Sequence, residues 1–429
     1  MEVSLYGERL GLAEWNPDRG TTTFQYSVEA RTRNREPSPI LMPLEEGVFE
    51  TSRDHANFHN LPYVLSDSMP DDFGNILLKE WLRQQQLSLD AIDPVERLTY
   101  IGNRGMGALE FRPLRHKQSG HRSIRIDELT EVARQVLEGK KVISYRDLDR
   151  ESLTDILRIG TSVGGARAKA LIAIRTDENQ NILEIRPGDV TQSGDFSYWL
   201  LKMDGVNEKS LGEGQGKGRI EYAYHQMARN AGIDMTDCGL HEENGRFHFL
   251  TKRFDRTPTG EKVHMQSLGA LAGIDYRLLR AGSYETLFRV MKRLNLPYPQ
   301  FEQQYRRMLF NVVARNQDDH VKNFSFLMDA DGTWRISPAY DLTYQYKPGG
   351  TWTDVHQSSI GGKFDHFSRQ DLLEFARLFG IKKAQEILEE VIESVSQWPR
   401  IAREASIPPD EIKTIGSHLR LREFRSFDH

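Results

Sequence analysis

The sequence contains almost no cysteine. Cys238 is the single cysteine among 429 residues, which excludes an internal disulfide and any zinc site that is built on several cysteines. A chain without disulfides suits a reducing compartment, so we expect a cytoplasmic protein.

Long hydrophobic runs and a surplus of basic charge are also missing. No apolar run approaches the length of about 18 residues at which a membrane-spanning helix is predicted. The opening residues, MEVSLYGERLGLAEW, lack a basic stretch followed by an apolar one, so no signal peptide is predicted. The formal net charge is −5, which excludes an overall basic surface for non-specific binding to nucleic acid. We therefore expect a globular protein without a membrane partner.

The pattern of the sequence changes along its length, and three zones are predicted. Residues 1–105 hold short runs of alternating apolar and polar residues between turn residues, which is typical of a small antiparallel sheet. Residues 106–265 mix strand-like and helix-like segments, and residues 266–429 are mainly helical in pattern. This layout predicts an α+β fold with a β-rich N-terminal subdomain, a mixed second region and a helical C-terminal region.

Local signals predict two helices and a loop. A helix is predicted over residues 220–231, because apolar residues recur on one face and Gly232 follows as a stop signal. A second helix is predicted within SRQDLLEFARLFG, which begins with a Ser-x-x-Asp capping signature and ends in glycine. GEGQGKGR at residues 212–219 is predicted to be a mobile loop.

The segment ARNQDDHVKNFSFL, residues 314–327, concentrates polar side chains between two apolar segments. Asp318 and Asn323 have the Asp-x-x-x-x-Asn spacing of a protein-kinase catalytic loop, in which the aspartate accepts the hydroxyl proton and the asparagine holds magnesium. One amide oxygen supplies too little negative charge for Mg²⁺, so a second acidic residue is expected. Asp341 follows a predicted strand, WRI, which the turn MDADGTW would join to the preceding strand. We expect Asp318, Asn323 and Asp341 to converge at one end of this hairpin.

Two other interpretations of this segment remain open. The Asp-x-x-x-x-Asn spacing is common by chance, and a polar loop between helices usually only contacts solvent. Asp318, Asp319 and His320 are also close enough in sequence to bind a single metal ion.

Phosphoryl transfer needs a phosphate-binding loop and a lysine upstream. Gly164 and Gly165 precede the alternating strand KALIAI and could turn main-chain N–H groups toward an anion, although a Gly-Gly hairpin turn is the commoner use of such a pair. Lys202 ends an apolar run, either as an edge residue with its charge in water or as a phosphate-binding lysine. Glu221 could pair with Lys202, although an acidic residue also suits the start of a helix. The order of these elements is that of a kinase-like two-lobed enzyme.

The motifs resemble those of one family. TSVGGARAKALI, LLKMDG, KRFDR, DDHVKNFSFL and ISPAYDLTY are similar to the successive motifs of HipA-family serine/threonine kinases, the toxins of HipBA-type toxin–antitoxin modules. FQYSVEA, PSPILMPL and SDSMPDDFGNILL are similar to the N-terminal subdomain of that family. The resemblance covers nearly the whole chain and implies a two-lobed protein-kinase-like fold. Residues 106–265 would form the N-lobe region and residues 266–429 the C-lobe.

The resemblance also implies roles for single residues. Asp318 would be the catalytic base, and Asn323 and Asp341 would be magnesium ligands. The other residues implied around ATP are the phosphate-covering loop Gly164, Gly165, Ala166, Arg167, Ala168 and Lys169, the phosphate-contacting Lys202, and His320, Lys322 and Tyr340 in the nucleotide site. TKRFDR at 251–256 would lie behind the adenine, with main-chain groups of Lys252, Arg253 and Phe254, and with Asp255 near the ribose. Ser162 falls at the autophosphorylation position of the family. Lys252 is a departure, because an acidic residue can occur there in the family, but a main-chain contact would survive this change.

The function that the resemblance implies is an ATP- and Mg²⁺-dependent serine/threonine-protein kinase that acts as the toxin of a type II module and is inactivated by autophosphorylation. Its expected partners are a HipB-like antitoxin, through which DNA would be contacted only indirectly, and a protein substrate, for which the family indicates an aminoacyl-tRNA synthetase. The alternative is a catalytically weak kinase-fold scaffold that acts with an antitoxin in DNA-bound transcriptional autoregulation. Retention of Asp318, Asn323, Asp341 and Lys202 favours the kinase. A metal-dependent hydrolase is not expected, because clustered histidine ligands are lacking.

Overall fold

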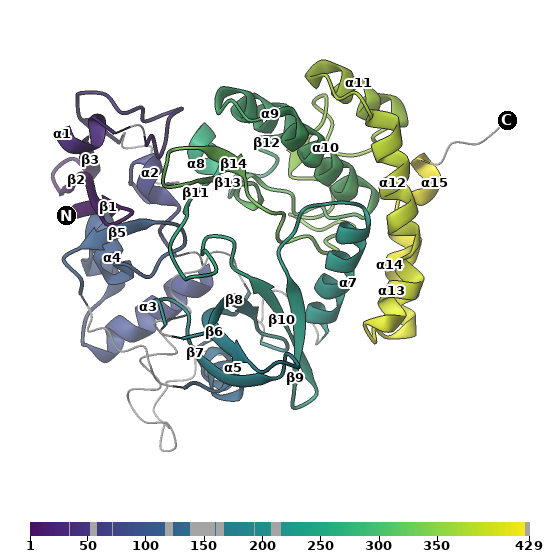
Figure 1. Ribbon diagram of the computed structural model, residues 1–429, viewed down its shortest axis with the longest axis horizontal. Helices are drawn as coiled ribbons and strands as arrows, with labels where there is room; N and C mark the ends of the chain where they lie inside the picture. Colours follow the sequence, from purple (N-terminus) through teal and green to yellow (C-terminus); the bar gives the residue numbers. More distant parts are fainter. Residues whose placement is uncertain are drawn as a thin grey trace.

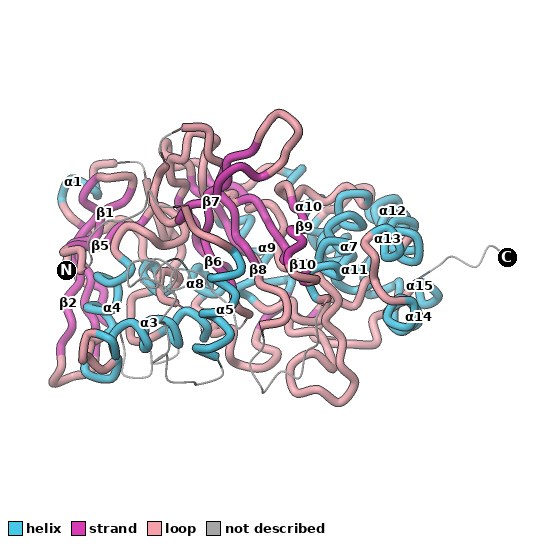
Figure 2. Tube along the Cα trace, turned by 90° about the horizontal axis from the view of Figure 1, so that it is seen from below, coloured by secondary structure: helices cyan, strands magenta, loops and turns pink. Residues whose placement is uncertain are grey.

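The computed structural model describes residues 1–33, 35–51, 58–70, 72–115, 123–137, 159, 167–192, 194–206 and 216–424. An N-terminal sheet lies at one end of the molecule, and the helices near the C-terminus lie at the other end (Figures 1 and 2). A second sheet lies between them in Figure 2. The α+β fold predicted from the sequence is confirmed, whereas the predicted domain boundaries stay a prediction.

The N-terminal region is an antiparallel sheet, which confirms the sheet predicted for the first zone. Its strand order is β4-β3-β2-β1-β5, and its strands are β1 (Glu2–Leu5), β2 (Glu8–Asn16), β3 (Thr21–Tyr26), β4 (Phe49–Glu50) and β5 (Leu109–Arg112). Phe24 and Tyr26 point into the core while Gln25 between them is exposed, as the two-residue period of a strand requires. The helical segments of this region are α1 (Val28–Arg31), α2 (Tyr63–Ser66), α3 (Asp72–Gln84), η2 (Leu89–Ala91) and α4 (Pro94–Ile101).

The second sheet carries the strand lysines. It is antiparallel with the order β7-β6-β8-β10-β9, and its strands are β6 (Lys169–Thr176), β7 (Ile182–Pro187), β8 (Ser197–Lys202), β9 (Cys238–Glu243) and β10 (Arg246–Lys252). Helices α5 (Ile126–Leu137) and α7 (Lys217–Asn230) accompany it. Lys169 of β6 and Lys202 of β8 are directly opposite each other, so their side chains leave the same face of the sheet.

The C-terminal region is mainly helical around a small sheet of order β11-β13-β14. The strands are β11 (His264–Ser267), β13 (Ser325–Met328) and β14 (Trp334–Ile336), with a separate pair of β12 (Gly282–Ser283) and β15 (Ser358–Ser359). The helical segments are α8 (Leu268–Ala272), α9 (Tyr284–Arg293), α10 (Tyr298–Val313), η3 (Val321–Asn323), α11 (Arg369–Phe379), α12 (Ala384–Ser396), α13 (Trp398–Glu404), α14 (Pro409–His418) and α15 (Leu421–Phe424). β13 and β14 form the hairpin that was predicted.

The two largest hydrophobic clusters of the described residues lie in different parts of the core. The larger one joins the N-terminal sheet to the C-terminal helices and includes Phe24 and Trp398. The smaller one lies around the second sheet and includes Leu129 of α5 and Ile172 of β6. Because the first cluster spans both ends of the chain, the N-terminal subdomain and the C-terminal helices share one core.

The helix predictions are confirmed, and part of the loop prediction is wrong. Ser368 and Asp371 form the predicted capping box of α11, and Gly380 ends this helix with φ 73°. Residues 212–215 lie outside the described residues, but Lys217–Arg219 form the first turn of α7. A Cβ atom at Gly218 would collide with the carbonyl oxygen of Phe247 in β10. This glycine therefore serves the close packing of a helix on a strand rather than mobility.

The described residues include no helix that is long and apolar enough to span a membrane.

Candidate functional site

Lys202 lies at the centre of a buried charge cluster. Its side chain is 6% exposed, and its ammonium group forms ion pairs with Glu221 of α7 and with Asp341. Arg167 donates a hydrogen bond to the other carboxylate oxygen of Glu221 at 2.9 Å. We call these four residues the Lys202 cluster. The predicted pairing of Glu221 with Lys202 is confirmed, and Lys202 is not an edge residue because β8 lies between β6 and β10.

The cluster keeps Lys202 and Asp341 charged. Burial alone would raise the pKa of Asp341, but Lys202 and Lys169 hold it well below its usual range. Burial lowers the pKa of Lys202, and the carboxylates of Asp341 and Glu221 more than offset this and raise it above its usual value. Lys169 is 5% exposed and adds a second positive charge on the same face of the sheet. At neutral pH the site therefore presents two lysine charges beside a charged aspartate.

The main chain holds Asp341 in an unusual conformation. Asp341 has φ 53°, in the left-handed region that non-glycine residues seldom adopt. The segment before it is fixed by the hydrogen bond from Ala339 N to Asp234 O at 2.8 Å. The buried Arg307 of α10 donates to Ser337 O at 2.8 Å. A residue kept in such a conformation by its surroundings is a feature of functional sites.

The catalytic-loop candidates lie at the same end of the hairpin as Asp341. Asn323 ends η3 directly before β13, and its side-chain amide donates to the carbonyl oxygen of Asp318 at 2.8 Å. This contact leaves the amide oxygen of Asn323 as an acceptor for a ligand. Tyr340, next to Asp341, donates to Lys322 O at 2.7 Å and so ties the two flanks of the hairpin together. Asp318, Asn323 and Asp341 therefore flank the same end of the β13–β14 hairpin, and their meeting around one ligand stays a prediction.

Asp318 and His320 are the more exposed members of this loop. The Asp318 side chain is 36% exposed, and its carboxylate lies 4.0 Å from His320 Nε2. The His320 ring packs on Tyr276 at 5.4 Å, and the Lys322 ammonium group lies 4.9 Å from the centre of the same ring. The charge of His320 contributes to the lowered pKa of Asp341, so the loop and the Lys202 cluster act on each other electrostatically.

Residues 251–256, which we call the hinge because they were predicted to lie behind the adenine, are held by the protein more tightly than the sequence indicated. Lys252 N donates to Asp237 O, Thr236 Oγ1 donates to Lys252 O, and Arg253 N donates to Tyr198 O. Within the described part of the chain, the main-chain groups of Phe254 have no such partner. The Phe254 ring lies 5.4 Å from the Tyr340 ring, so the hinge touches the hairpin. The expected main-chain contacts to adenine stay a prediction, for which the main chain of Phe254 is the best placed of the three residues.

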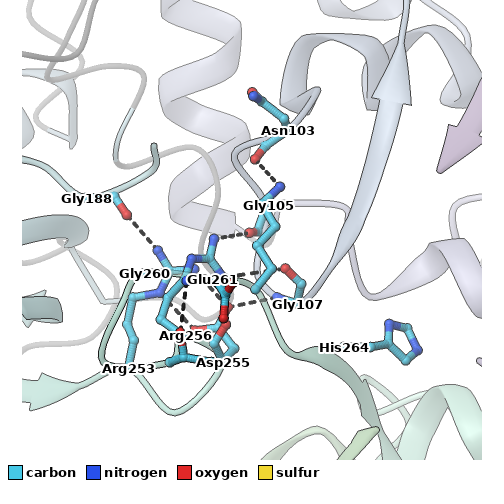
Figure 3. A network of polar contacts seen from close by, with 12 residues as sticks. Asn103, Gly105, Gly107, Gly188, Arg253, Asp255, Arg256, Gly260, Glu261 and His264 are labelled. Atoms are coloured by element: carbon cyan, nitrogen blue, oxygen red, sulfur yellow. Dashed lines mark hydrogen bonds and ion pairs between the residues drawn. The ribbon is translucent and has the colours of Figure 1, made fainter. Parts of the chain in front are cut away.

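Asp255 has a different role from the ribose contact that the resemblance implied. Its side chain is 0% exposed, and both carboxylate oxygens accept hydrogen bonds from Arg253, at 2.9 and 2.8 Å. Arg256 and Gly107 N donate to one of the same oxygens at 2.7 and 2.8 Å (Figure 3). Arg253 also donates to Gly188 O at 2.8 Å. This set, which we call the Asp255 cluster, joins residues 251–256 to the segment before β5 and leaves the Asp255 carboxylate without solvent exposure, which disfavours a contact with a sugar.

The remaining predicted residues divide into three groups. Ala168 is fully buried and its carbonyl oxygen accepts a hydrogen bond from Met203 N, so its place in the phosphate-covering loop stays a prediction. Arg167 turns to Glu221 as described above. Ser162, Gly164, Gly165 and Ala166 lie outside the described residues.

The site fits a magnesium ion that phosphate oxygens would help to hold. Asn323 and Asp341 supply one amide oxygen and one carboxylate, and Asp341 remains 34% exposed beside Lys202. Mg²⁺ is usually held by one or two such groups together with phosphates and waters. Among the described residues no group of three or more His, Cys, Asp or Glu side chains is placed to hold a metal ion. Asp319 in particular is buried away from His320 and Asp318, which disfavours the single-metal interpretation of this segment.

Sequence reasoning missed two groups that shape the site. Arg307 was not identified, although an arginine within the apolar segment RRMLFNVV is a signal that could have drawn attention to it. Asp319 was considered only as a metal ligand, because its hydrogen-bond donors come from residues far away in the sequence.

Family models match two parts of the chain. A family model described as the HipA-like C-terminal domain matches residues 161–398, and one described as the HipA N-terminal domain matches residues 1–112. The chain is 28% identical over 167 residues to Y4dM of Sinorhizobium fredii, which is named as a candidate kinase; the match covers 36% of this chain and 39% of Y4dM. It is 20% identical over 298 residues to a protein of Haemophilus influenzae with the same kind of name, covering 61% of this chain and 81% of that protein. The chain thus spans about two fifths of the length of Y4dM.

A solved structure shows the same fold. It is HipA in a complex with HipB and operator DNA from a toxin–antitoxin system of Shewanella oneidensis MR-1. The TM-score is 0.68 at 17% sequence identity, and the superposition covers 99% of this chain and 95% of that chain.

Proposed function

The chain belongs to the HipA family, and from this premise we propose that it is an ATP- and Mg²⁺-dependent serine/threonine-protein kinase. We further propose that it acts as the toxin of a type II toxin–antitoxin module. It would inhibit growth by phosphorylating a cellular protein, with an aminoacyl-tRNA synthetase as the first candidate.

The observation that carries this proposal is the Lys202 cluster. Lys202, Glu221 and Asp341 come from a strand, a helix and the segment after a hairpin, yet they form one ion-paired group. An upstream lysine that is oriented by a helix glutamate, beside a metal-binding aspartate, is the arrangement that phosphoryl transfer from ATP uses in protein kinases. A scaffold would not need to hold charged groups in a partly exposed, strained arrangement.

Each residue then has a chemical task. Asp318 would accept the proton of a serine or threonine hydroxyl as its oxygen attacks the γ-phosphorus and the bond to the β–γ bridging oxygen breaks. Lys202 and Lys169 would bind phosphate oxygens, and Glu221 keeps Lys202 oriented. Asn323 and Asp341 would hold magnesium, which neutralises charge on the phosphates when it is bound. The main chain of Phe254 would contact the adenine.

Regulation and partners follow from the same proposal. Ser162 would be the autophosphorylation site, and a phosphate there would add about −1.5 to −2 charge beside the loop that covers the ATP phosphates. A HipB-like antitoxin would be the protein partner, because the structure with the shared fold is a complex with HipB and operator DNA. Contact with DNA would occur through that antitoxin.

The test compares the parent chain with Asp318→Ala and with a matched control, Asp331→Ala. Asp331 is an exposed aspartate in the turn at the opposite end of the same hairpin. Purified proteins are incubated with Mg·ATP, phosphosites are mapped by mass spectrometry, and phosphoproteomes are compared after expression in cells. We expect phosphorylation by the parent and the control and a loss of about 10²–10⁴-fold in rate for Asp318→Ala.

Growth inhibition should follow the same pattern. If Asp318→Ala inhibits growth as strongly as the parent, toxicity comes from binding, and the scaffold interpretation replaces the kinase toxin. If the parent transfers no phosphate to itself or to cellular proteins, the kinase proposal fails.

A further inference from the structure

Asp319 follows the proposed catalytic base Asp318 in the sequence, but its side chain is buried in the protein. Asp318 has a side chain that is 36% exposed, whereas the side chain of Asp319 is 0% exposed. A carboxylate is excluded from water only when hydrogen-bond donors compensate for the loss of hydration. The donors around Asp319 therefore indicate what its charge is used for.

Donors from two distant elements converge on Asp319. Its Oδ2 accepts from the hydroxyl group of Tyr284 at 2.8 Å and lies 2.9 Å from Nδ1 of the buried His356. Its Oδ1 accepts from Gln357 N at 2.8 Å and from Ser358 N at 3.4 Å. The hydroxyl group of Ser358 also donates to the carbonyl oxygen of Asp319 at 2.6 Å. Both the side chain and the main chain of Asp319 are thus fixed.

The hydrogen bonds continue from Asp319 toward Asp341, the proposed magnesium ligand. Asn311 Nδ2 of α10 donates to the Tyr284 hydroxyl oxygen at 2.9 Å. Asn316 Nδ2 donates to Asn311 Oδ1 at 2.9 Å and to the carbonyl oxygen of Asp341 at 3.5 Å. A chain of buried polar contacts therefore connects the residue after Asp318 with the main chain of Asp341.

The same contacts reach the exposed surface beside the catalytic loop. The side-chain oxygen of Gln357 accepts from Arg280 N at 3.1 Å, and its amide group donates to Trp352 O. Arg280 and Trp352 are both exposed. The segment 356–358 therefore links Asp319 to two surface loops that carry exposed side chains.

We propose that Asp319 is the positioning residue of the catalytic loop, which sets the main chain of Asp318 relative to Asp341. This inference rests on the proposed kinase function, but it assigns a role to a residue that touches neither nucleotide nor substrate. Asp319 is the point at which α9, the segment 356–358 and the catalytic loop meet. A small displacement of a catalytic group is enough to reduce a rate by about 10²-fold, so such an anchor matters for turnover.

Asp319→Asn is the sharpest variant because it keeps the shape of the side chain. One of the two oxygens becomes an NH₂ group, which cannot accept from the Tyr284 hydroxyl or from a His356 N–H. Tyr284→Phe removes a single donor from the same network. Asp371→Asn is the matched control, because Asp371 is also held by several hydrogen bonds, but its partners are Ser368 at the start of α11 and Lys363 rather than Asp319 or Tyr284.

The first measurement is the initial rate of autophosphorylation as a function of ATP concentration, per folded molecule. We expect Asp319→Asn to lower the maximal rate by about 10²-fold while the half-saturating ATP concentration changes less than about threefold. Tyr284→Phe should lower it less, and the two changes together should be less than additive because they remove parts of one network. Asp371→Asn should melt earlier than the parent and keep its maximal rate. An unchanged maximal rate in Asp319→Asn overturns the proposal.

The second measurement is hydrogen–deuterium exchange of the apoprotein, which does not depend on activity. We expect faster exchange in Asp319→Asn within residues 314–323 and 356–359, with α12 unchanged. Faster exchange spread evenly over the C-terminal helices would show a general structural role and would also overturn the proposal. If the parent proves inactive, the kinase function fails and the exchange pattern alone decides whether Asp319 holds the loop.

Discussion

The Lys202 cluster and the Asp255 cluster are both groups of charged side chains in the interior, but they differ in solvent exposure and in how fully protein groups pair their charges. In the Asp255 cluster, Arg253 and Asp255 are 0% exposed and Arg256 is 4% exposed, and the guanidinium groups also donate to carbonyl oxygens such as Gly188 O. In the Lys202 cluster, Arg167 and Asp341 remain 23% and 34% exposed. The Asp255 cluster is closed by protein groups, whereas the Lys202 cluster is open at the partly exposed carboxylate of Asp341, the proposed magnesium ligand.

This difference predicts which cluster contributes mainly to the stability of the fold and which contributes mainly to catalysis. A buried charge that is fully paired within the protein costs little only while every partner is present, so its loss appears in stability. A charged group that stays partly exposed beside two lysines can exchange water for a ligand without disturbing the fold. We therefore expect changes in the Lys202 cluster to affect catalysis and changes in the Asp255 cluster to affect unfolding.

The largest effect is expected in the Lys202 cluster, and it concerns the rate of phosphate transfer. Lys202→Met should lower the rate of phosphate transfer by about 10²–10³-fold, because the charge proposed to bind phosphate is lost. The free energy of unfolding should fall less than in Asp255→Asn, because the buried Glu221 loses one partner but keeps its hydrogen bond to Arg167, and Asp341 can be hydrated. Phosphate transfer and urea unfolding are measured on the same preparation. A variant that transfers phosphate normally would show that Lys202 only holds the sheet to α7.

The next largest effect is expected in the Asp255 cluster, and it concerns stability. Asp255→Asn should lower the free energy of unfolding by about 3–5 kcal/mol, because Arg253 and Arg256 are left buried without their carboxylate. The transfer rate per folded molecule should fall far less than in Lys202→Met. Urea unfolding with Asp331→Asn as the control checks this. A loss below about 1 kcal/mol, as for a surface pair, would contradict the distinction between the clusters.

A smaller effect concerns pH and the surroundings of the closed cluster, where His264 lies (Figure 3). Burial lowers the pKa of His264 to about 4, whereas an unfolded histidine titrates near about 6.5. The unfolded chain takes up the proton first as the pH falls, so stability should decrease from about pH 6.5 to pH 4, by at most about 3 kcal/mol. Burial would raise the pKa of Asp255, but Arg253 and Arg256 hold it well below its usual range, so Asp255 adds nothing in this window.

The measurement is the free energy of unfolding between about pH 7 and pH 4.5 for the parent and for His264→Gln. The variant should lose less stability over this range than the parent. Part of the slope should remain, because burial also lowers the pKa of His248 to about 4. An equal dependence of the unfolding free energy on pH in the two proteins would show that protonation of His264 does not destabilise the folded protein.

The sequence alone was sufficient for the local features and for the order of the motifs. The hairpin around MDADGTW, the capping box at Ser368 and the pairing of Lys202 with Glu221 depend on spacing and on short-range signals, and all are present. The α+β fold followed from the change in pattern along the chain.

The remaining features depend on contacts between distant residues. Asp255 was expected at a ribose because KRFDR is similar to a hinge motif, but its partner Gly107 N lies 148 positions away. Asp319 was open to a metal role for the same reason, since its donors belong to Tyr284 and to residues 356–358. Gly218 was assigned to a loop because its contact with β10 is not visible in the sequence. Spacing in the sequence identifies candidate site residues, and tertiary contacts decide which of them already pair with other protein groups.

The most direct test of the open cluster is a calorimetric titration with ATP, with and without magnesium, on the parent and on Asp341→Asn. Asp341 combines the exposed carboxylate, the strained main chain and the contact with Lys202. The parent should bind ATP more tightly when magnesium is present. Asp341→Asn should lose this dependence on magnesium, with an affinity for Mg·ATP that is lower by about 10²-fold, and its unfolding should be close to that of the parent. Retention of the full magnesium dependence in Asp341→Asn would contradict the assignment of the Lys202 cluster as the site of Mg·ATP.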